Sequence, residues 1–243
     1  MKQNTTIVIL HGWGLSGTRF LPLQRELEKH GYNVFAPDLP GFGDSKIPDH
    51  PLTLTDYADF FDAYLTKHAI TGAVLIGHSF GGRVSLKFNE LYPNRVRALI
   101  LSGTPGFTPI PKKKLIFFIF LAKIGGFLFS IPPLSLVQDA VRRWYYYVVG
   151  AKEFFRAEGA MRETFKRIVR EDLVTSMEAI SIPTLLLWGE YDIIVPISIA
   201  ERVHRLIAGS ELIIIPEASN GVPYREPVVF ASYAERFMKN IPA

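Results

Sequence analysis

One stretch of the chain decides the fold: Val74-Leu75-Ile76-Gly77-His78-Ser79-Phe80-Gly81-Gly82. Its first residues form an apolar run that is typical of a buried strand, and Val84, Phe88 and Leu91 after it recur at helical spacing. We therefore expect Ser79 at a tight turn between a strand and a helix. The pattern Gly-x-Ser-x-Gly is typical of such a turn, in which strained backbone lifts the serine hydroxyl clear of the sheet.

Ser79 at this turn is a candidate nucleophile. The backbone N–H of Phe80, at the start of the helix, would face an oxyanion that forms on a carbonyl attacked by Ser79. The five-residue pattern also occurs by chance in unrelated chains. The interpretation of Ser79 as a nucleophile therefore depends on the strand predicted before it and the helix predicted after it.

Apolar runs that read as further buried strands occur at residues 6–10, 33–36, 98–101, 184–188 and 212–215. Amphipathic helices are predicted around Phe20, Leu23 and Leu27, and from about Thr55 onward, where one face carries Tyr57, Phe60, Phe61, Tyr64 and Leu65. This alternation predicts an α/β fold with a mostly parallel central sheet and helices on both faces. In such a sheet, ligands bind at the carboxyl ends of the strands.

The alternation stops between about Thr104 and Ser181, which predicts a helical cap at residues 105–181 inserted into a core of residues 1–104 and 182–243. The insertion has its own helical spacing, and it holds 12 of the Lys and Arg residues against 7 Asp and Glu. Its apolar residues at that spacing include Trp144, Val148, Met161, Phe165, Ile168 and Val169. No part of it resembles a nucleic-acid-binding motif, so no nucleic-acid partner is expected.

Residues 112–133 begin with three lysines, which an apolar, phenylalanine-rich run follows. A membrane-spanning helix needs about 20 apolar residues, whereas this run is interrupted by Lys123 and by Gly125-Gly126. We interpret it as a cap helix that lines an apolar pocket. Weak contact with a membrane surface through the lysines and aromatics is the alternative.

Composition narrows the chemistry further. The chain has 243 residues, which suits one α/β domain. It has no cysteine, and its six histidines show no metal-binding spacing. We therefore expect no disulfide, no metal and no cofactor. The N-terminus lacks the features of a signal peptide, which makes a cytoplasmic location the default expectation.

Four motifs stand in one order along the chain: His11-Gly12-Trp13-Gly14, residues 38–45 (Asp38 to Ser45), Gly77-His78-Ser79-Phe80-Gly81-Gly82, and Trp188-Gly189-Glu190-Tyr191-Asp192. With these motifs the chain resembles the α/β-hydrolase superfamily, and most of all small capped serine carboxylesterases, including those that act on methyl esters of acyl chains.

This resemblance implies a role for each motif. Ser79 would be the nucleophile and Asp192 the acid of a catalytic triad, and the backbone N–H groups of Trp13 and Phe80 would form the oxyanion hole. The substrate would be a small apolar ester. A serine nucleophile also argues against the dehalogenase and epoxide-hydrolase branches, which use aspartate there. Asp38 and Asp44 are expected to be structural.

The general base is missing from this pattern. Asn220 occupies the position where the resemblance places the catalytic histidine, and no histidine follows His204. An amide cannot accept the Ser79 proton near neutral pH, so the chain as written should be nearly inert. His11 is expected in the oxyanion loop and His78 pointing away from Ser79, so neither should replace the base.

Two explanations of Asn220 stay open. It is either an engineered His→Asn replacement in an active hydrolase, or a natural residue of an Asn-Gly turn in a protein that binds a small ligand without reacting. Within catalysis, hydrolysis of a carbon–carbon bond in a diketone is the alternative to ester hydrolysis.

Overall fold

The computed structural model describes residues 5–107 and 159–241. Its centre is a six-stranded sheet in the order β2-β1-β3-β4-β5-β6, in which every neighbouring pair is parallel. The six strands are β1 (Thr6–Leu10), β2 (Asn33–Phe35), β3 (Ala73–His78), β4 (Val96–Ser102), β5 (Thr184–Gly189) and β6 (Glu211–Ile215). The α/β fold with a parallel sheet that the sequence predicts is confirmed.

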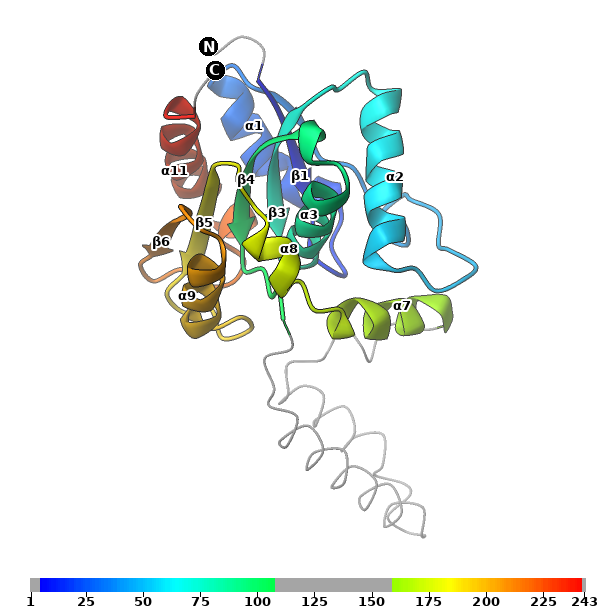
Figure 1. Cartoon of the computed structure of the whole chain (residues 1–243). Helices are drawn as coiled ribbons and strands as arrows, with labels where there is room; N and C mark the ends of the chain where they lie inside the picture. Colours follow the sequence, from blue (N-terminus) through cyan, green and yellow to red (C-terminus); the bar gives the residue numbers. More distant parts are fainter. Residues whose placement is uncertain (1–4, 108–158, 242–243) are drawn as a thin grey trace, which may run out of the picture.

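Helices cover both faces of this sheet (Figure 1). One face is covered by α1 (Leu21–Lys29) and α11 (Pro227–Lys239), and the other by α2 (Leu54–Lys67), α3 (Phe80–Leu91), α8 (Val174–Glu178) and α9 (Ile197–Leu206). The remaining helical segments are η1 (Gly17–Phe20), η2 (Pro93–Arg95), α7 (Gly159–Arg170) and α10 (Val222–Arg225).

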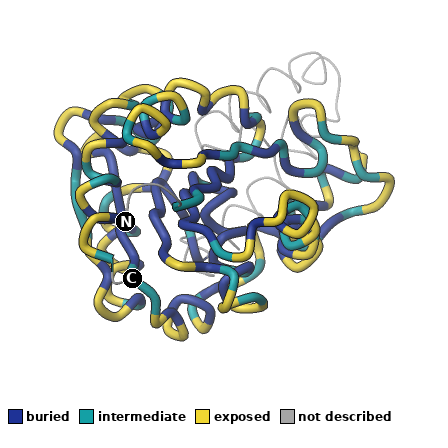
Figure 2. The backbone as a smooth tube through the Cα atoms, turned by 90° about the horizontal axis from the view of Figure 1, so that it is seen from above, coloured by how far each residue is buried: buried dark blue, intermediate teal, exposed yellow. Residues whose placement is uncertain are grey.

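The continuous apolar runs of the strands follow from this arrangement. In β1, Ile7 and Ile9 pack into the cluster beneath α1 and α11, whereas Val8 and Leu10 pack into the cluster beneath α2 and α3. Side chains alternate between the faces of a strand, so a strand that is covered on both faces needs an apolar residue at every position. Figure 2 shows the result as buried chain inside a rim of exposed helices and loops.

The helix that the sequence predicts from about Thr55 is α2, which begins one residue earlier. Thr53 caps it: its hydroxyl accepts a hydrogen bond from the Asp56 N–H at 3.2 Å, and the Asp56 carboxylate accepts one from the Thr53 N–H at 2.6 Å. Such reciprocal capping satisfies two backbone donors at the helix start. Along the predicted face, Tyr57, Phe61 and Leu65 are buried, and Phe60 and Tyr64 are partly buried.

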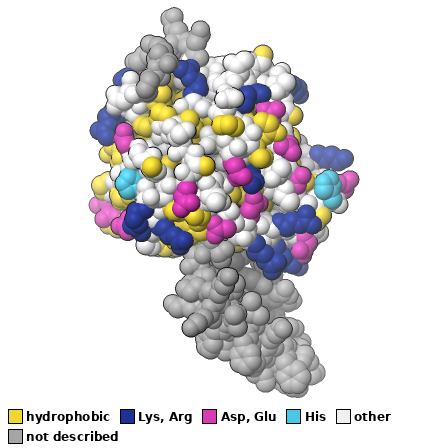
Figure 3. Space-filling view, in the orientation of Figure 1, with side chains coloured by type: hydrophobic (Ala, Val, Ile, Leu, Met, Phe, Trp, Pro, Cys, Tyr) yellow, Lys and Arg dark blue, Asp and Glu magenta, His cyan; other side chains and the backbone are white. Residues whose placement is uncertain are grey.

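Two apolar residues that the sequence places on buried helix faces lie at the surface instead. Leu91 is 41% exposed because it is the last residue of α3, where the helix reaches solvent. Val169 is also 41% exposed, since α7 buries only the narrow stripe of Met161, Thr164 and Ile168. Such single apolar residues on a surface are common, and Figure 3 shows hydrophobic side chains dispersed among charged ones on one face.

Within the predicted cap, the structure describes residues 105–107, α7, α8, and the segments between α7 and α8 and between α8 and β5. The expectations for Trp144, for Val148 and for residues 112–133 fall outside the described residues. Within the two described ranges, no helix is long and apolar enough to cross a lipid bilayer.

Glycines let α3 approach the sheet very closely. A Cβ atom on Gly81 would lie 2.0 Å from the carbonyl oxygen of Leu10 in β1, and one on Gly77 would lie 2.5 Å from the Cα of Gly82. Contacts this short are possible only without a side chain. The glycines around Ser79 therefore set the spacing between strand and helix.

We expect Gly81→Ala to lower the free energy of unfolding by about 3 kcal/mol, because the added methyl group meets rigid backbone. Urea denaturation followed by circular dichroism measures this change. Gly72→Ala is the control, since its Cβ would meet nothing closer than 3.6 Å, and we expect a change of less than about 1 kcal/mol. Equal effects of the two substitutions would contradict this account of the packing.

Candidate active site

Ser79 lies between the last residue of β3 and the first residue of α3, with φ 51° and ψ −110°. A positive φ is unusual for a residue with a side chain. The Ser79 N–H donates to the carbonyl oxygen of Ser102 in the neighbouring strand at 2.9 Å, and the Ser79 carbonyl accepts from the N–H groups of Gly82 and Arg83. The strained turn that the sequence predicts is therefore present and is held on both sides.

The loop after β1 is fixed by a buried, neutral histidine. The N–H of Leu39 donates to His11 Nε2 at 3.0 Å, so the ring proton lies on Nδ1, which donates to the carbonyl oxygen of Gly12 at 2.8 Å. Burial lowers the pKa of His11, which favours this neutral form. Both nitrogens of His11 are thus used to hold the loop that carries Trp13.

Trp13 is the centre of an aromatic cluster at the carboxyl end of the sheet. Its ring makes edge-to-face contacts with Phe42 at 4.9 Å, Phe80 at 5.3 Å and Phe165 of α7 at 5.0 Å between ring centroids. Tyr57 of α2 also makes an edge-to-face contact with Phe80, at 4.9 Å between ring centroids. The two residues predicted to supply the oxyanion hole are therefore in direct contact through their side chains.

Asp192 follows β5 and is nearly buried, with an exposure of 5%. Its Oδ1 accepts hydrogen bonds from the N–H groups of Ile194 at 3.0 Å and Val195 at 2.7 Å. Burial raises the pKa of Asp192, and these hydrogen bonds act against the rise. The loop is closed by the indole N–H of Trp188, which donates to the carbonyl oxygen of Val195 at 2.7 Å.

Asn220 lies in the turn before α10, and its Nδ2 donates to Asp192 Oδ2 at 2.7 Å. A carboxylate only accepts, so the amide nitrogen must face it and the amide oxygen remains as an acceptor. Gly103, with φ 55°, lies against this pair: a Cβ there would be 2.4 Å from Asn220 Nδ2 and 3.4 Å from Asp192 Oδ2. The sequence-predicted pair is thus brought together from two loops.

The structure does not join Ser79 to this pair by a hydrogen bond. Among residues 5–107 and 159–241, the Ser79 hydroxyl makes no hydrogen bond to another side chain. His78 is buried on the opposite face of the sheet against Phe20 and Tyr224, at ring distances of 6.0 and 5.6 Å. As the sequence predicts, it points away from Ser79.

Asp38 is structural, also as predicted. Its carboxylate accepts from the Gly17 N–H at 2.6 Å and the Asp44 N–H at 2.9 Å, which ties two loops together. Beside these loops an open cavity of about 550 Å³ is lined by Gly14, Leu15, Ser16, Thr18, Arg19, Phe42 and Gly43. It includes none of the predicted catalytic residues. Among residues 5–107 and 159–241, no cluster of three or more His, Asp or Glu side chains could hold a metal ion.

Two residues that support the site, Gly103 and Trp188, were not predicted to do so from the sequence. A signal for Gly103 was present, because a glycine directly after a buried strand lies at the same sheet edge as Ser79 and Asp192. Trp188 was noted as the end of an apolar run and the start of the fourth motif, but neither pattern predicts the hydrogen bond of its indole to Val195.

Together, the strained serine between strand and helix, the glycine-rich loop after the first strand and the buried aspartate after β5 define a site of the α/β-hydrolase class. Residues 5–178 match the family described as alpha/beta hydrolase fold. The chain belongs to this family.

Relatives with named activities include two kinds of hydrolase. The chain is 28% identical over 255 residues to the pimeloyl-[acyl-carrier protein] methyl ester esterase of Shewanella woodyi, covering 98% of this chain and 93% of that protein. It is 27% identical over 230 residues to a 2-hydroxy-6-oxononadienedioate/2-hydroxy-6-oxononatrienedioate hydrolase of Klebsiella pneumoniae, covering 85% and 77%. Among solved structures, an esterase from Exiguobacterium antarcticum matches with a TM-score of 0.74 at 23% identity, covering 99% of this chain and 94% of that one.

The buried His78 makes stability depend on pH. Burial lowers the pKa of His78 to about 4, against 6.5 for the ordinary side chain. The unfolded chain therefore binds the proton more readily, and stability falls as pH drops from about 6.5 to 4. We expect this residue to account for about 3 kcal/mol of that loss.

The measurement is the free energy of unfolding by urea at several pH values between 4 and 7. In His78→Asn the curve should be flatter over this range than in the parent protein, whatever the stability of the variant at pH 7. An equally steep curve in both would show that His78 does not stay neutral in the folded protein.

Proposed function

We propose that the protein is a serine hydrolase of carboxylic esters with an apolar acyl group. The observation that carries this proposal is the backbone of Ser79, with φ 51° at the junction of β3 and α3. Such strain at a non-glycine residue is characteristic of functional sites. The esterase among the relatives supports the same reaction.

The proposed chemistry proceeds through an acyl-enzyme. Ser79 Oγ attacks the ester carbonyl, and the backbone N–H groups of Phe80 and Trp13 stabilise the negative charge that develops on the carbonyl oxygen. The alcohol leaves with a proton, and water then releases the acid from Ser79. Each half of this reaction needs a base that takes a proton from the attacking oxygen.

Asn220 cannot serve as that base. Its amide nitrogen is committed to Asp192 at 2.7 Å, and its oxygen is not basic near neutral pH. Removal of the base from a serine triad lowers turnover by a factor on the order of 10⁶. We therefore propose that the chain with Asn220 is close to inactive, and that histidine at this position gives the active form.

The aromatic cluster supports an apolar acyl group. Trp13, Phe42, Phe80 and Phe165 gather around the loop and the helix start that would hold the ester carbonyl. Such rings offer apolar surface and no charge, so a hydrocarbon chain gains more binding free energy against them than a charged group does.

Carbon–carbon bond hydrolysis of a diketone is the alternative within catalysis, and the Klebsiella relative supports it. A panel of p-nitrophenyl esters of graded chain length separates the two reactions in a variant with histidine at position 220. Hydrolysis that rises with acyl chain length favours the esterase, and no hydrolysis at any length favours the alternative.

A second candidate function is non-catalytic binding of a small ligand. The hydrogen bond between Asn220 and Asp192 favours it, because that bond satisfies the buried carboxylate without any imidazole. In this case the site between sheet and α7 would hold an apolar ligand, and Ser79 would act only as a hydrogen-bonding group.

We expect Asn220→His to create or restore esterase activity by several orders of magnitude, whereas Asn220→Ala does not. One imidazole nitrogen would donate to Asp192 where the amide now does, and the other would accept the Ser79 proton. The initial rate of p-nitrophenyl butyrate hydrolysis measures the gain.

The control is the double variant Ser79→Ala with Asn220→His, in which the gain must vanish because the base acts only through the nucleophile. If Asn220→His folds normally yet hydrolyses neither esters nor diketones above the background rate, the catalytic proposal fails and the binding function is favoured.

A further inference from the structure

The side chain of Arg83, in the first turn of α3, lies at the junction between the sheet and α7. It is only 4% exposed. Its guanidinium donates to the carbonyl oxygens of Pro105 at 2.6 Å and Ile168 at 2.7 Å, and also to that of Glu171. Pro105 follows β4, whereas Ile168 and Glu171 lie at the end of α7. One buried side chain therefore joins the segment that follows β4 to the end of α7.

This contact uses properties that only arginine has. The carbonyl groups at the end of a helix lack intrahelical partners and carry partial negative charge. A planar guanidinium can donate to several of them at once, which a lysine cannot do in the same geometry. Burial lowers the pKa of Arg83 to about 10, against the raising influence of Glu171 and Asp172, so the group stays charged at neutral pH.

The preceding turns of α7 meet the loops of the site. Thr164 Oγ1 accepts a hydrogen bond from the Leu52 N–H at 2.8 Å, and Phe165 packs on Trp13 at 5.0 Å. Trp13 in turn packs on Phe80, three residues before Arg83 on the same helix. The contacts form a closed path from Arg83 through α7 and Trp13 back to α3.

We propose that Arg83 is a positioning residue: by anchoring the end of α7 it seats Phe165 on Trp13 and so fixes the loop that carries the Trp13 N–H. The first turn of α3 then controls both candidate oxyanion donors, the Phe80 N–H directly and the Trp13 N–H through α7. The effect of Arg83 on catalysis rests on the proposed esterase function. The effect of Arg83 on the position of Trp13 concerns the folded chain alone and does not depend on that function.

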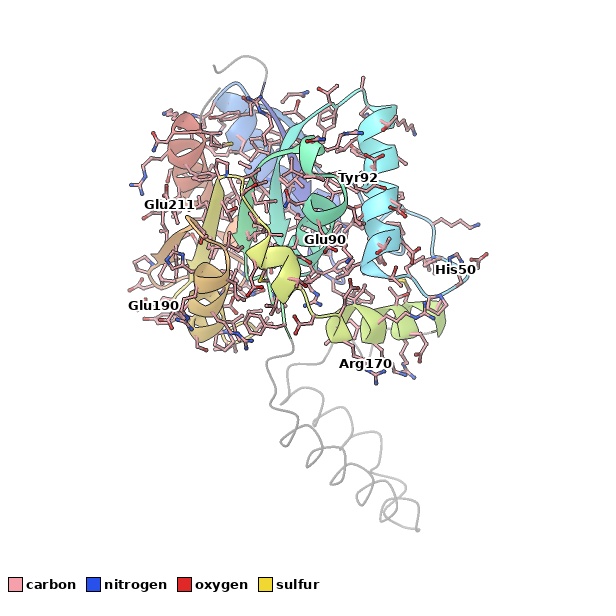
Figure 4. All side chains as sticks on the ribbon, viewed as in Figure 1. His50, Glu90, Tyr92, Arg170, Glu190 and Glu211 are labelled. Atoms are coloured by element: carbon pink, nitrogen blue, oxygen red, sulfur yellow. The ribbon has the colours of Figure 1, made fainter. Side chains whose placement is uncertain are left out.

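Lys87 offers a matched control, because it lies one turn further along α3 and also contacts Glu171, the residue directly after α7. Its Nζ forms ion pairs at 3.2 Å with the carboxylates of Glu171 and Glu90, and it contacts no carbonyl group of α7. Glu90 is in the last turn of α3 and accepts a hydrogen bond from Ser176 of α8, and Figure 4 shows it away from Arg170 at the end of α7. Lys87→Met therefore removes charge from this junction and leaves the anchor of α7 in place.

Hydrogen exchange followed by mass spectrometry tests the positional claim in the protein as it exists. In Arg83→Met we expect exchange at least tenfold faster in residues 161–171 and also in residues 9–15, with no change in α1. Arg83→Lys should fall between, and Lys87→Met should match the parent protein. Faster exchange in 161–171 with unchanged 9–15 would overturn the proposal, since Arg83 would then be a local anchor only.

Kinetics in the Asn220→His background tests the catalytic consequence. Loss of an oxyanion donor acts on the transition state, so Arg83→Met should lower kcat tenfold or more and change KM less than about threefold, with partial rescue by Arg83→Lys. A rise in KM alone would overturn this consequence. If Asn220→His has no activity, the proposed function fails, and hydrogen exchange still decides the role of Arg83.

A third variant covers the case in which Arg83 substitutions do not fold. Phe165→Ala leaves the anchor intact and removes the contact with Trp13. It should speed exchange in residues 9–15 at least tenfold and leave the Arg83 end of α7, residues 167–171, unchanged. Unchanged exchange in residues 9–15 would overturn the proposal without any Arg83 variant.

Discussion

The strained backbone at Ser79 is the constraint on which the rest of the site depends. A left-handed conformation at a residue with a side chain costs about 1–3 kcal/mol, so surrounding contacts must hold it. Here the Ser79 N–H is bound to Ser102 in β4, and glycines at 77 and 81 bring the helix to within contact of the β3 and β1 backbones. Because α3 begins so close to β1, the loop after β1 passes directly beside Phe80. The turn that exposes the serine thereby also places Trp13.

Local patterns in the sequence were enough to predict the sheet and this turn. Buried strands and amphipathic helices each leave a periodic signal, and the glycines around Ser79 mark the turn. The placement of Asp192 at the same edge as Ser79 followed from one further rule, that the carboxyl ends of parallel strands share an edge. The pairing of Asp192 with Asn220 was implied by the resemblance to the α/β-hydrolase superfamily. The hydrogen bond between them confirms that the two loops meet. Their relation to Ser79 stays a prediction.

The sequence could not have predicted the contacts that hold α7. Arg83 binds carbonyl groups, which every residue possesses, so the identities of Pro105 and Ile168 carry no signal of the contact. Thr164 and its partner Leu52 are 112 positions apart, and no local periodicity relates them. The exposure of Val169 has the same origin, because the buried stripe of a helix depends on which surface the helix meets.

The hydrogen bonds around Asp192 hold its buried carboxylate without any histidine. The N–H groups of Ile194 and Val195 hold the carboxylate, and the indole of Trp188 closes the loop, independently of residue 220. The amide of Asn220 supplies the remaining donor at the place where an imidazole N–H would lie. In the active form that we propose, histidine at position 220 would donate to the same carboxylate oxygen, because the buried carboxylate needs a donor there and not a base. Asparagine at this position lacks a second ring nitrogen, the acceptor that the proposed mechanism needs beside Ser79. A donor at position 220 therefore serves the carboxylate in either of the two proposed functions, and the reactivity of Ser79 distinguishes the proposed hydrolase from the proposed binding protein.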